Sequence, residues 1–387
     1  MQLVAYGAQD IYLTGNPQIT FFKVVYRRHT NFSMESIEQT FNGTADFGRK
    51  VTVNVSRNGD LIHKCWLRAT LPAAGAGINY LEEVGHYLIK SVEVEIGGQK
   101  LDKHYGHWLS IWSDLSTPSG KKSLYDDNMV GPAGDNTAVT VNVPLQFWFC
   151  RHAGLALPLI ALQYHEVKFN IEFETLTNIV YAGQNVSGDG ADAGNDVITA
   201  HTITGSMSDV AMYVDYIYLD TEERRRFAQI SHEYLIEQLQ FTGDETVSAN
   251  SRVKLNFNHP VKELVWVLVD DDATLDNSAS DKHNYSPMTS AKLQLNGHDR
   301  FSERQVDYFR YVQPFQHHTN VPAKNVNVYS FALKPEEQQP SGSANMSRID
   351  NATLQISQTG AETIKVFATN YNVLRIMSGM GGLAYSN

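Results

Sequence analysis

The chain has 387 residues, of which 42% are hydrophobic and 19% are charged, and this composition excludes a disordered chain. Its length suits two domains of about 190 residues each, and its many aromatic, Val, Thr and Ile residues favour β structure. The formal net charge of -11 excludes a general electrostatic attraction to DNA, so no direct contact with nucleic acid is expected.

Cysteine usage and hydropathy bear on the compartment. The two cysteines, Cys65 and Cys150, lie in apolar runs and are expected to be buried free thiols in a reducing environment. The most apolar stretch, 154–162, is shorter than the ~20 residues that span a bilayer, so no membrane span is expected. The first residues lack a basic segment followed by an apolar core, which predicts no signal peptide.

Residues 1–34 are too few for a domain and read as an N-terminal arm. The apolar run TFFKVVY contains Phe21 and Phe22, and Arg27 and Arg28 follow it. Two interpretations remain open. The arm packs on the main body, or it docks on a partner through these four residues.

Strand patterns dominate residues 35–220, which are expected to form the first domain. Alternating apolar residues and turn sequences such as Asn58-Gly59 predict strands joined by hairpins. One helix is expected over 103–115, and long polar loops over 116–136 and 175–208. The strands are expected over 35–41, 51–56, 61–71, 88–96, 139–149, 164–173 and 210–219.

A short stretch, 215–231, divides the chain. Its strand pattern ends at Leu219, and Asp220 or Thr221 can then cap a helix whose first turn holds acidic residues favoured by the helix dipole. A new strand is expected from Tyr234. We therefore predict a helical linker over 221–232 between two β domains. The residues expected to form this joint are Glu222, Arg224, Arg225 and Phe227.

Residues 233–387 repeat the plan of the first domain. Gly98 matches Gly297 at a separation of 199 residues, and Trp66 matches Trp266 at 200. Glu38-Gln39 and VTVNV likewise match Glu237-Gln238 and VKLNF, and a helix is expected over 302–312. The predicted fold is all-β: two tandem eight-stranded jelly-roll sandwiches, with short helices in loops and at the joint between them.

Motifs that carry chemistry fail on context. Gly379-Met-Gly381-Gly resembles a dinucleotide loop, but no helix follows to receive a phosphate. His104 and His107, on the expected helix, and the pair His317-His318 lack a third metal ligand at a diagnostic spacing. No cofactor, metal or catalytic residue is therefore expected, which favours a structural protein over an enzyme. Sequons at Asn185, Asn284 and Asn345 lie in expected loops and are candidate glycosylation sites.

Four long stretches carry a family resemblance: 7–32 (GAQDIYLTGNPQITFFKVVYRRHTNF), 56–72 (SRNGDLIHKCWLRATLP), 215–238 (DYIYLDTEERRRFAQISHEYLIEQ) and 370–387 (NYNVLRIMSGMGGLAYSN). With them the chain resembles the major capsid proteins of nucleocytoplasmic large DNA viruses. The resemblance implies a double jelly roll. It also implies a homotrimer that forms a pseudo-hexagonal capsomer of an icosahedral shell.

The resemblance also implies partners. Neighbouring capsomers, a penton protein and minor capsid proteins would contact the trimer. The arm would lie on the inner side near the minor proteins, which would link the shell to any inner membrane. The long loops would face outward, where a host receptor could bind. The implied location is the virion, after assembly in the host cytoplasm. The alternative function is a tandem β-sandwich that binds carbohydrate or a receptor through its long loops.

Overall fold

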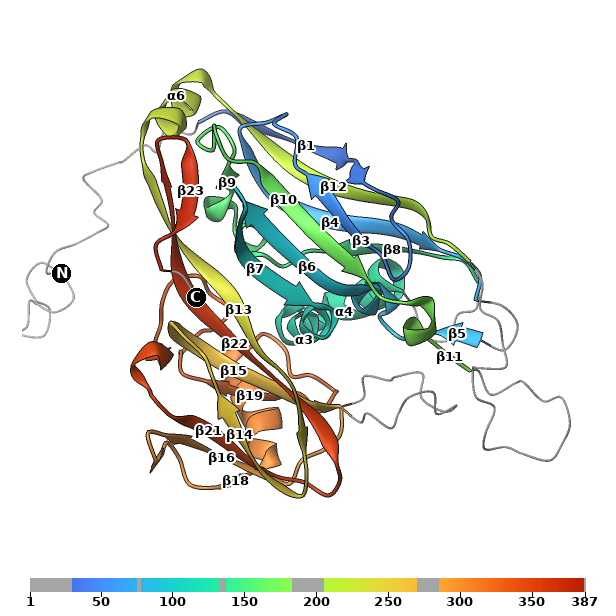
Figure 1. The fold of residues 1–387 in the computed structure, drawn as a ribbon, viewed down its shortest axis with the longest axis vertical. Coiled ribbons are helices and arrows are strands. Elements are labelled where there is room, and N and C mark those ends of the chain that lie inside the picture. Colours follow the sequence, from blue (N-terminus) through green and yellow to red (C-terminus); the bar gives the residue numbers. More distant parts are fainter. Residues whose placement is uncertain (1–29, 75–77, 132–136, 183–204, 270–284, 386–387) are drawn as a thin grey trace, which may run out of the picture.

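The computed structural model describes residues 30–74, 78–131, 137–182, 205–269 and 285–385. Each half of the chain forms two facing antiparallel sheets, and the two sandwiches lie side by side (Figure 1). Between the sheets of each sandwich lies an apolar core. Strand sequences explain this directly, because alternate residues of a strand point to opposite faces and the inward set is apolar.

In the first sandwich, one sheet has the order β1-β12-β4-β8 and the other β2-β3-β10-β6-β7, and a small third sheet pairs β11 with β5. The strand β4 reproduces the expected bounds of 61–71. The strands are β1 (Phe32–Gln39), β2 (Phe41–Asn42), β3 (Lys50–Asn54), β4 (Leu61–Leu71), β5 (Ile78–Tyr80), β6 (Ile89–Ile96), β7 (Gln99–Tyr105), β8 (Val139–Pro144), β9 (Leu157–Pro158), β10 (Val167–Phe173), β11 (Val180–Ala182) and β12 (Ser208–Leu219).

In the second sandwich, the orders are β13-β22-β15-β19 and β14-β21-β16-β17. The strands are β13 (His232–Val247), β14 (Asn250–Leu255), β15 (Pro260–Val269), β16 (Ser290–Leu295), β17 (His298–Asp299), β18 (Arg304–Gln305), β19 (Asn327–Ser330), β20 (Ala344–Asn345), β21 (Ala352–Ser357), β22 (Glu362–Met377) and β23 (Met380–Leu383).

The two sandwiches share one topology. Taken in their order across the sheets, β1, β12, β4 and β8 of the first correspond to β13, β22, β15 and β19 of the second, and β3, β10, β6 and β7 to β14, β21, β16 and β17. Gly98 and Gly297 both have positive φ, 85° and 79°, in the equivalent hairpin turns. The predicted double jelly roll is confirmed, and the two sandwiches are called the first and second roll below.

The proposed match of Trp66 with Trp266 was wrong by one residue, and the same registers place Glu38 opposite Tyr213 and Phe241 opposite Phe367, so that Glu38 does not match Glu237. Trp66 lies opposite Tyr213 in the pairing of β4 with β12, and the equivalent pair in the second roll is Val265 opposite Phe367. Trp66 therefore corresponds to Val265 and faces outward, whereas Trp266 lies in the core of the second roll. A shift of one residue exchanges the two faces of a strand.

The helices differ most from expectation. The helix predicted over 103–115 begins later, because β7 continues to Tyr105 and α3 spans Gly106–Ser116. The helix predicted over 302–312 is η6 (Tyr308–Val312) followed by α7 (Gln313–His317). The strand expected over 139–149 ends at Pro144, which cannot donate a ladder hydrogen bond. Further helical segments are α2 (Val84–Leu88), α4 (Ser119–Tyr125), η1 (Asp126–Val130), α5 (Trp148–Arg151), η2 (Ala153–Leu155), η3 (Leu176–Ile179), α6 (Thr221–Gln229) and η7 (Met346–Arg348).

Two of these helical segments, α4 and η1, form residues 119–130 of the stretch for which a loop is predicted over 116–136. The prediction for the cysteines is confirmed, since Cys65 and Cys150 are free and buried.

Residues of the second roll contribute to the core of the first roll. Ile236, Leu374 and Ile376 belong to the second roll's long strands β13 and β22, yet they pack in the core of the first roll.

Candidate functional site

Helix α3 of the first roll covers the outer face of one sheet of the second roll, the sheet with the order β13-β22-β15-β19. Trp108, Ile111, Trp112 and Leu115 pack with apolar side chains that include Val265 and Phe367. The rings of Trp108 and Phe367 lie 5.5 Å apart. Burying a large apolar side chain contributes roughly 1.5–3 kcal/mol. A set of this size therefore holds the two rolls together as one body.

A buried charge cluster reinforces this junction. Glu83 of the first roll is 2% exposed, and its Oε1 lies 3.0 Å from Nζ of Lys324 of the second roll. Its Oε2 accepts a hydrogen bond from Ser110 Oγ at 2.6 Å and lies 3.2 Å from His86 Nδ1. Burial alone would raise the pKa of Glu83. The His86 hydrogen bond and the charges of Lys324 and Lys122 outweigh it and hold the pKa well below its usual value.

A second set of charges crosses the junction at β13. Arg151 of the first roll places Nη1 2.9 Å from Glu237 Oε2, and Lys262 Nζ lies 2.6 Å from the other oxygen of that carboxylate. The guanidinium of Arg151 also stacks 3.9 Å above the ring of Trp112. Asp102 of β7 accepts a hydrogen bond from the backbone N–H of Leu239 at 3.0 Å. Breaking such a buried pair leaves an uncompensated charge, which is strongly destabilising.

Within the second roll, His318 is held between two carboxylates. Its Nε2 lies 3.0 Å from Glu263 Oε2, and its Nδ1 lies 3.0 Å from Glu336 Oε1. The His318 and Glu263 side chains are fully buried. Burial would lower the pKa of His318, but the charge and hydrogen bond of Glu263, together with Glu336, raise it to about 9. At neutral pH this side chain is therefore an imidazolium ion that ties β15 to the segments at 318 and 336.

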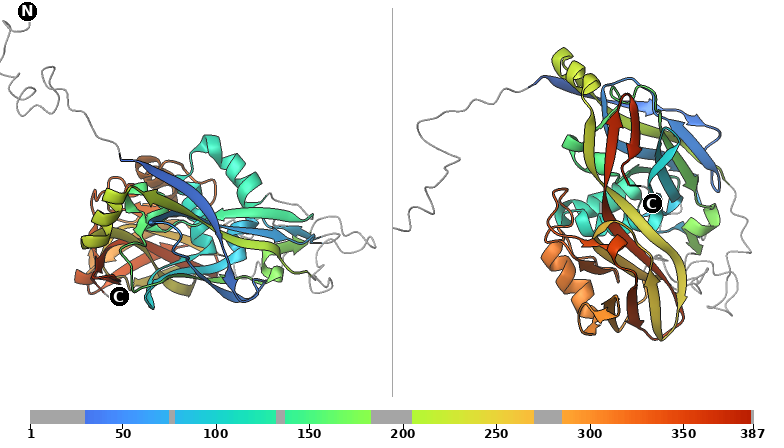
Figure 2. Two further views of the ribbon diagram at one scale, coloured as in Figure 1. Left: turned by 90° about the horizontal axis from the view of Figure 1, so that it is seen from above. Right: turned by 60° about the vertical axis from the view of Figure 1, so that its left-hand side comes forward.

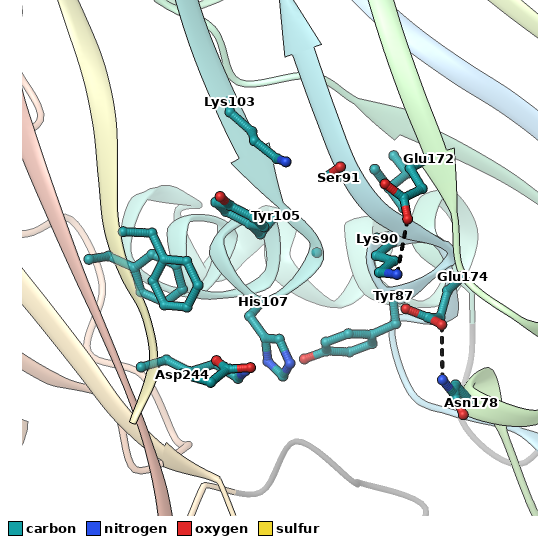
Figure 3. Close-up of a pocket in the computed structure, with 15 residues that line it drawn as sticks. Tyr87, Lys90, Ser91, Lys103, Tyr105, His107, Glu172, Glu174, Asn178 and Asp244 are labelled. Carbon is teal, nitrogen blue, oxygen red and sulfur yellow. Dashed lines mark hydrogen bonds and ion pairs between the residues drawn. The ribbon is translucent and has the colours of Figure 1, made fainter. Parts of the chain in front are cut away.

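A groove of about 430 Å³ lies where the two rolls meet (Figure 3). Lys90 and Glu172 of the first roll form an ion pair of 3.0 Å on one wall, and Lys365 pairs with Asp244 of the second roll on the other. His107 lies in the groove, and burial lowers its pKa to about 3, so that it is neutral at pH 7. The groove is thus lined by these two ion pairs, by aromatic rings and by Glu174, which accepts a hydrogen bond from the Asn178 amide at 2.9 Å.

Among the residues that the structure describes, no three His, Cys, Asp or Glu side chains come together as a group that could hold a metal ion. In the same part of the chain, no helix is both long and apolar enough to cross a membrane.

Comparisons with known proteins identify the family. Residues 20–220 match the family described as major capsid protein N-terminus, and residues 223–382 match large eukaryotic DNA virus major capsid protein. The major capsid protein of Pyramimonas orientalis virus is 57% identical over 419 residues, covering 100% of this chain and 99% of that protein. The chain belongs to the major capsid proteins of large eukaryotic DNA viruses.

Other relatives agree. The major capsid protein of Phaeocystis pouchetii virus is 44% identical over 521 residues, with 100% of this chain and 99% of that protein covered. The solved structure of PBCV-1 VP54, fitted into a reconstruction of the virophage Sputnik, has a TM-score of 0.80 at 38% identity and covers 95% of this chain and 100% of that one. This major capsid protein is accordingly a structural component of the virion and not an enzyme. The relatives favour this function over carbohydrate or receptor binding.

The predicted joint of this capsid protein is α6. Asp220 caps the helix, since its Oδ1 accepts a hydrogen bond from the Thr221 N–H at 2.7 Å. Arg224 pairs with Asp60 at 2.9 Å, and Phe227 packs on a small cluster formed by Leu61, Ala156 and Ile217. Glu222 and Arg225 are exposed. Helix α6 thus connects the rolls covalently at one end (Figure 1), whereas α3 makes the packed interface between them.

The other candidate sites have mixed outcomes. The arm residues Phe21, Phe22, Arg27 and Arg28 lie outside the described residues, as do Asn185 and Asn284. Asn345 is exposed, and its side-chain oxygen accepts a hydrogen bond from the Ser347 N–H at 3.1 Å. Glycosylation at the three sequons stays a prediction.

The glycine motif and the histidines have structural roles. Gly379 and Gly381 lie in the hairpin of β22 and β23, where an added Cβ would stand 2.6 Å from the Tyr164 ring and 2.7 Å from Leu162. The glycines therefore let this hairpin approach the first roll closely. His104 and His107 do not share a helix, contrary to expectation, because His104 lies in β7 and pairs with Asp102 at 3.0 Å.

The junction itself was missed in the sequence. Its charged partners, such as Glu83 and Lys324, are far apart in the chain and carry no motif. A usable signal does exist in α3. Apolar residues at 108, 109, 111, 112 and 115 cover more than one face of the helix, which indicates a helix buried on two sides.

Proposed function

We propose that three copies of this capsid protein close into a trimer with a pseudo-hexagonal outline, the capsomer that tiles an icosahedral shell. The observation that carries the proposal is the identical strand order of two rolls lying side by side in one chain. Three such chains provide six similar units, and six similar units fill a sixfold lattice position. A closed ring of three uses heterologous contacts, in which the second roll of one copy meets the first roll of the next.

Mass in solution tests this proposal. The chain mass is 43.3 kDa, so native mass spectrometry of the purified protein should give a species of about three times that value, near 130 kDa. Negative-stain images should show a hexagonal outline with a threefold axis. Permanent interfaces usually bury on the order of 2,000 Å² or more, so the trimer should persist at micromolar concentration. A monodisperse monomer at that concentration would contradict the proposal.

The proposed partners follow from position in such a shell. Neighbouring capsomers and a penton protein would meet the rim of the trimer, and residues 1–34 would reach minor capsid proteins on the inner side. The long polar loop expected over 175–208 would face outward, where a host receptor would first make contact. These assignments rest on the family resemblance and on the length of this loop in the sequence.

A further inference from the structure

The two rolls carry equivalent helices, although only one of them is covered. Helix α3 follows β7, and the segment 308–317, formed by η6 and α7 and called the second-roll helix here, lies at the same place in the second roll. Leu109 packs in the core of the first roll, and Phe309 packs in the core of the second. The apolar spacing also agrees, because 108, 109, 111, 112 and 115 are matched by 308, 309, 311, 312 and 315.

The outward faces of these helices differ in burial. Ile111, Trp112 and Leu115 of α3 are buried against the second roll. Their counterparts Tyr311, Val312 and Phe315 are exposed by 44%, 40% and 80%. The second-roll helix lies on the outside of the molecule (Figure 2, right view, orange). An apolar face that is buried in one repeat is therefore open in the other.

The sheet face of the second roll that packs against α3 has an equivalent face in the first roll, and that face is partly exposed. In the second roll, the cross-strand pair Val265 and Phe367 lies under α3. The equivalent pair in the first roll is Trp66 and Tyr213, whose rings stack 5.6 Å apart at 15° on the outer face. Both side chains are only half-buried. Among the described residues, the outward apolar face of the second-roll helix has no sheet packed on it, and the outer face around Trp66 and Tyr213 has no helix packed on it.

We propose that the second-roll helix of one copy packs across Trp66 and Tyr213 of the next copy, repeating between chains the contact that α3 makes within one chain. This inference rests on the proposed trimer and assigns its contact surfaces. In such a trimer, the rotation that relates the two rolls of one copy would also relate the second roll of that copy to the first roll of the neighbouring copy. Three helices then meet three sheet faces, and the closed ring leaves none of either open.

Charge agrees with this pairing. Asp307 is exposed and lies one helical turn before Tyr311, on the same stripe as Tyr311 and Phe315. Lys64 and Arg68 are exposed and flank Trp66 on the same face of β4. Asp307 would thus meet Lys64 and Arg68 beside Trp66. On the other side of the aromatic pair, Glu38 accepts a hydrogen bond from the Tyr213 hydroxyl at 3.4 Å. This asymmetry of charge favours one orientation of approach.

Two variants on opposite surfaces test the pairing. Phe315→Asp breaks the helix face and Trp66→Asp breaks the sheet face, so each alone should reduce the trimer population at least tenfold in native mass spectrometry. An equimolar mixture should form a heterodimer of about twice 43.3 kDa, because the intact helix of one variant can still bind the intact sheet face of the other. Neither variant alone can do this. Trimeric Phe315→Asp, or a mixture that stays monomeric at tens of micromolar, would overturn the inference.

Controls separate the possible failures. Met377→Asp places the same charge at an exposed apolar residue elsewhere and should remain trimeric. Circular dichroism and thermal unfolding check each fold, and Arg68→Glu, at an exposed position, replaces Trp66→Asp if that variant does not fold. A monomeric wild type would overturn the proposed trimer together with this pairing. A trimeric wild type with an unaffected Phe315→Asp variant would overturn the pairing alone, as would occupancy of the helix face by residues 1–29 of the same chain.

Discussion

The buried residue His318 makes the stability of the second roll depend on pH. His318 contacts Glu263 and Glu336, and Lys262 is the other charge that acts on Glu263. The pKa of His318 rises from 6.5 to about 9 on folding. A raised pKa means that the folded state holds its proton more tightly than the unfolded chain does. The resulting stabilisation is fully present below pH 6.5 and is lost as the pH rises through 9.

We expect His318→Gln to be destabilised relative to wild type by roughly 3 kcal/mol at pH 6, from the size of the pKa difference. The gap should narrow between pH 7 and pH 10, because wild type loses its imidazolium ion and the variant has none to lose. Urea unfolding at several pH values measures both free energies. A gap that is constant over this range would show that His318 does not titrate as described.

At the scale of elements, the placement of α3 depends on its first residue. Gly106 packs so closely on the preceding segment that an added Cβ would stand 2.7 Å from the His86 carbonyl oxygen and 2.8 Å from that of Ile89. Backbone oxygens cannot move aside as a flexible side chain can. This glycine therefore fixes where the helix begins and how it lies against the second roll.

Gly106→Ala should lower the free energy of unfolding by about 1–3 kcal/mol, the usual cost of overpacking. Gly120 of α4 is the matched control, because a Cβ there meets nothing within 4 Å. Gly120→Ala should be neutral or stabilising by about 1 kcal/mol, since alanine favours a helix. Thermal and urea unfolding of the two variants compare them directly. Equal changes in the free energy of unfolding for the two variants would mean that the close packing at Gly106 does not determine the position of α3.

The strands were predictable and the junction was not, for physical reasons. In β4 the alternation of apolar residues is a local signal, so its bounds of 61–71 followed from the sequence. The face of a strand on which a tryptophan lies depends on how that strand pairs with its neighbours, and no local sequence signal specifies this pairing. For this reason the match of Trp66 with Trp266 was wrong. The ion pair of Glu83 with Lys324 joins residues that only the folded chain brings together.

At the scale of the whole molecule, we expect the N-terminal arm to be needed for shell assembly and the two rolls to be sufficient for folding and trimer formation. Deleting residues 1–27 should leave the trimer folded but impair assembly into shells, because those residues are proposed to reach minor capsid proteins. Native mass spectrometry reports the trimer, and electron microscopy of the assembly reaction with the minor proteins reports shells. A truncated chain that cannot fold would place the arm in the core and contradict its docking role.

The long strands β13 and β22 have a consequence for biosynthesis. Ile236, Leu374 and Ile376 complete the core of the first roll, and the hairpin that follows at Gly379 docks beside Tyr164. A nascent chain that has emerged from the ribosome only as far as residue 220 therefore lacks part of its own interior. The first roll therefore cannot complete its core until residues near 376 have been synthesised. During that interval its apolar interior is partly exposed, and we expect chaperones to bind it.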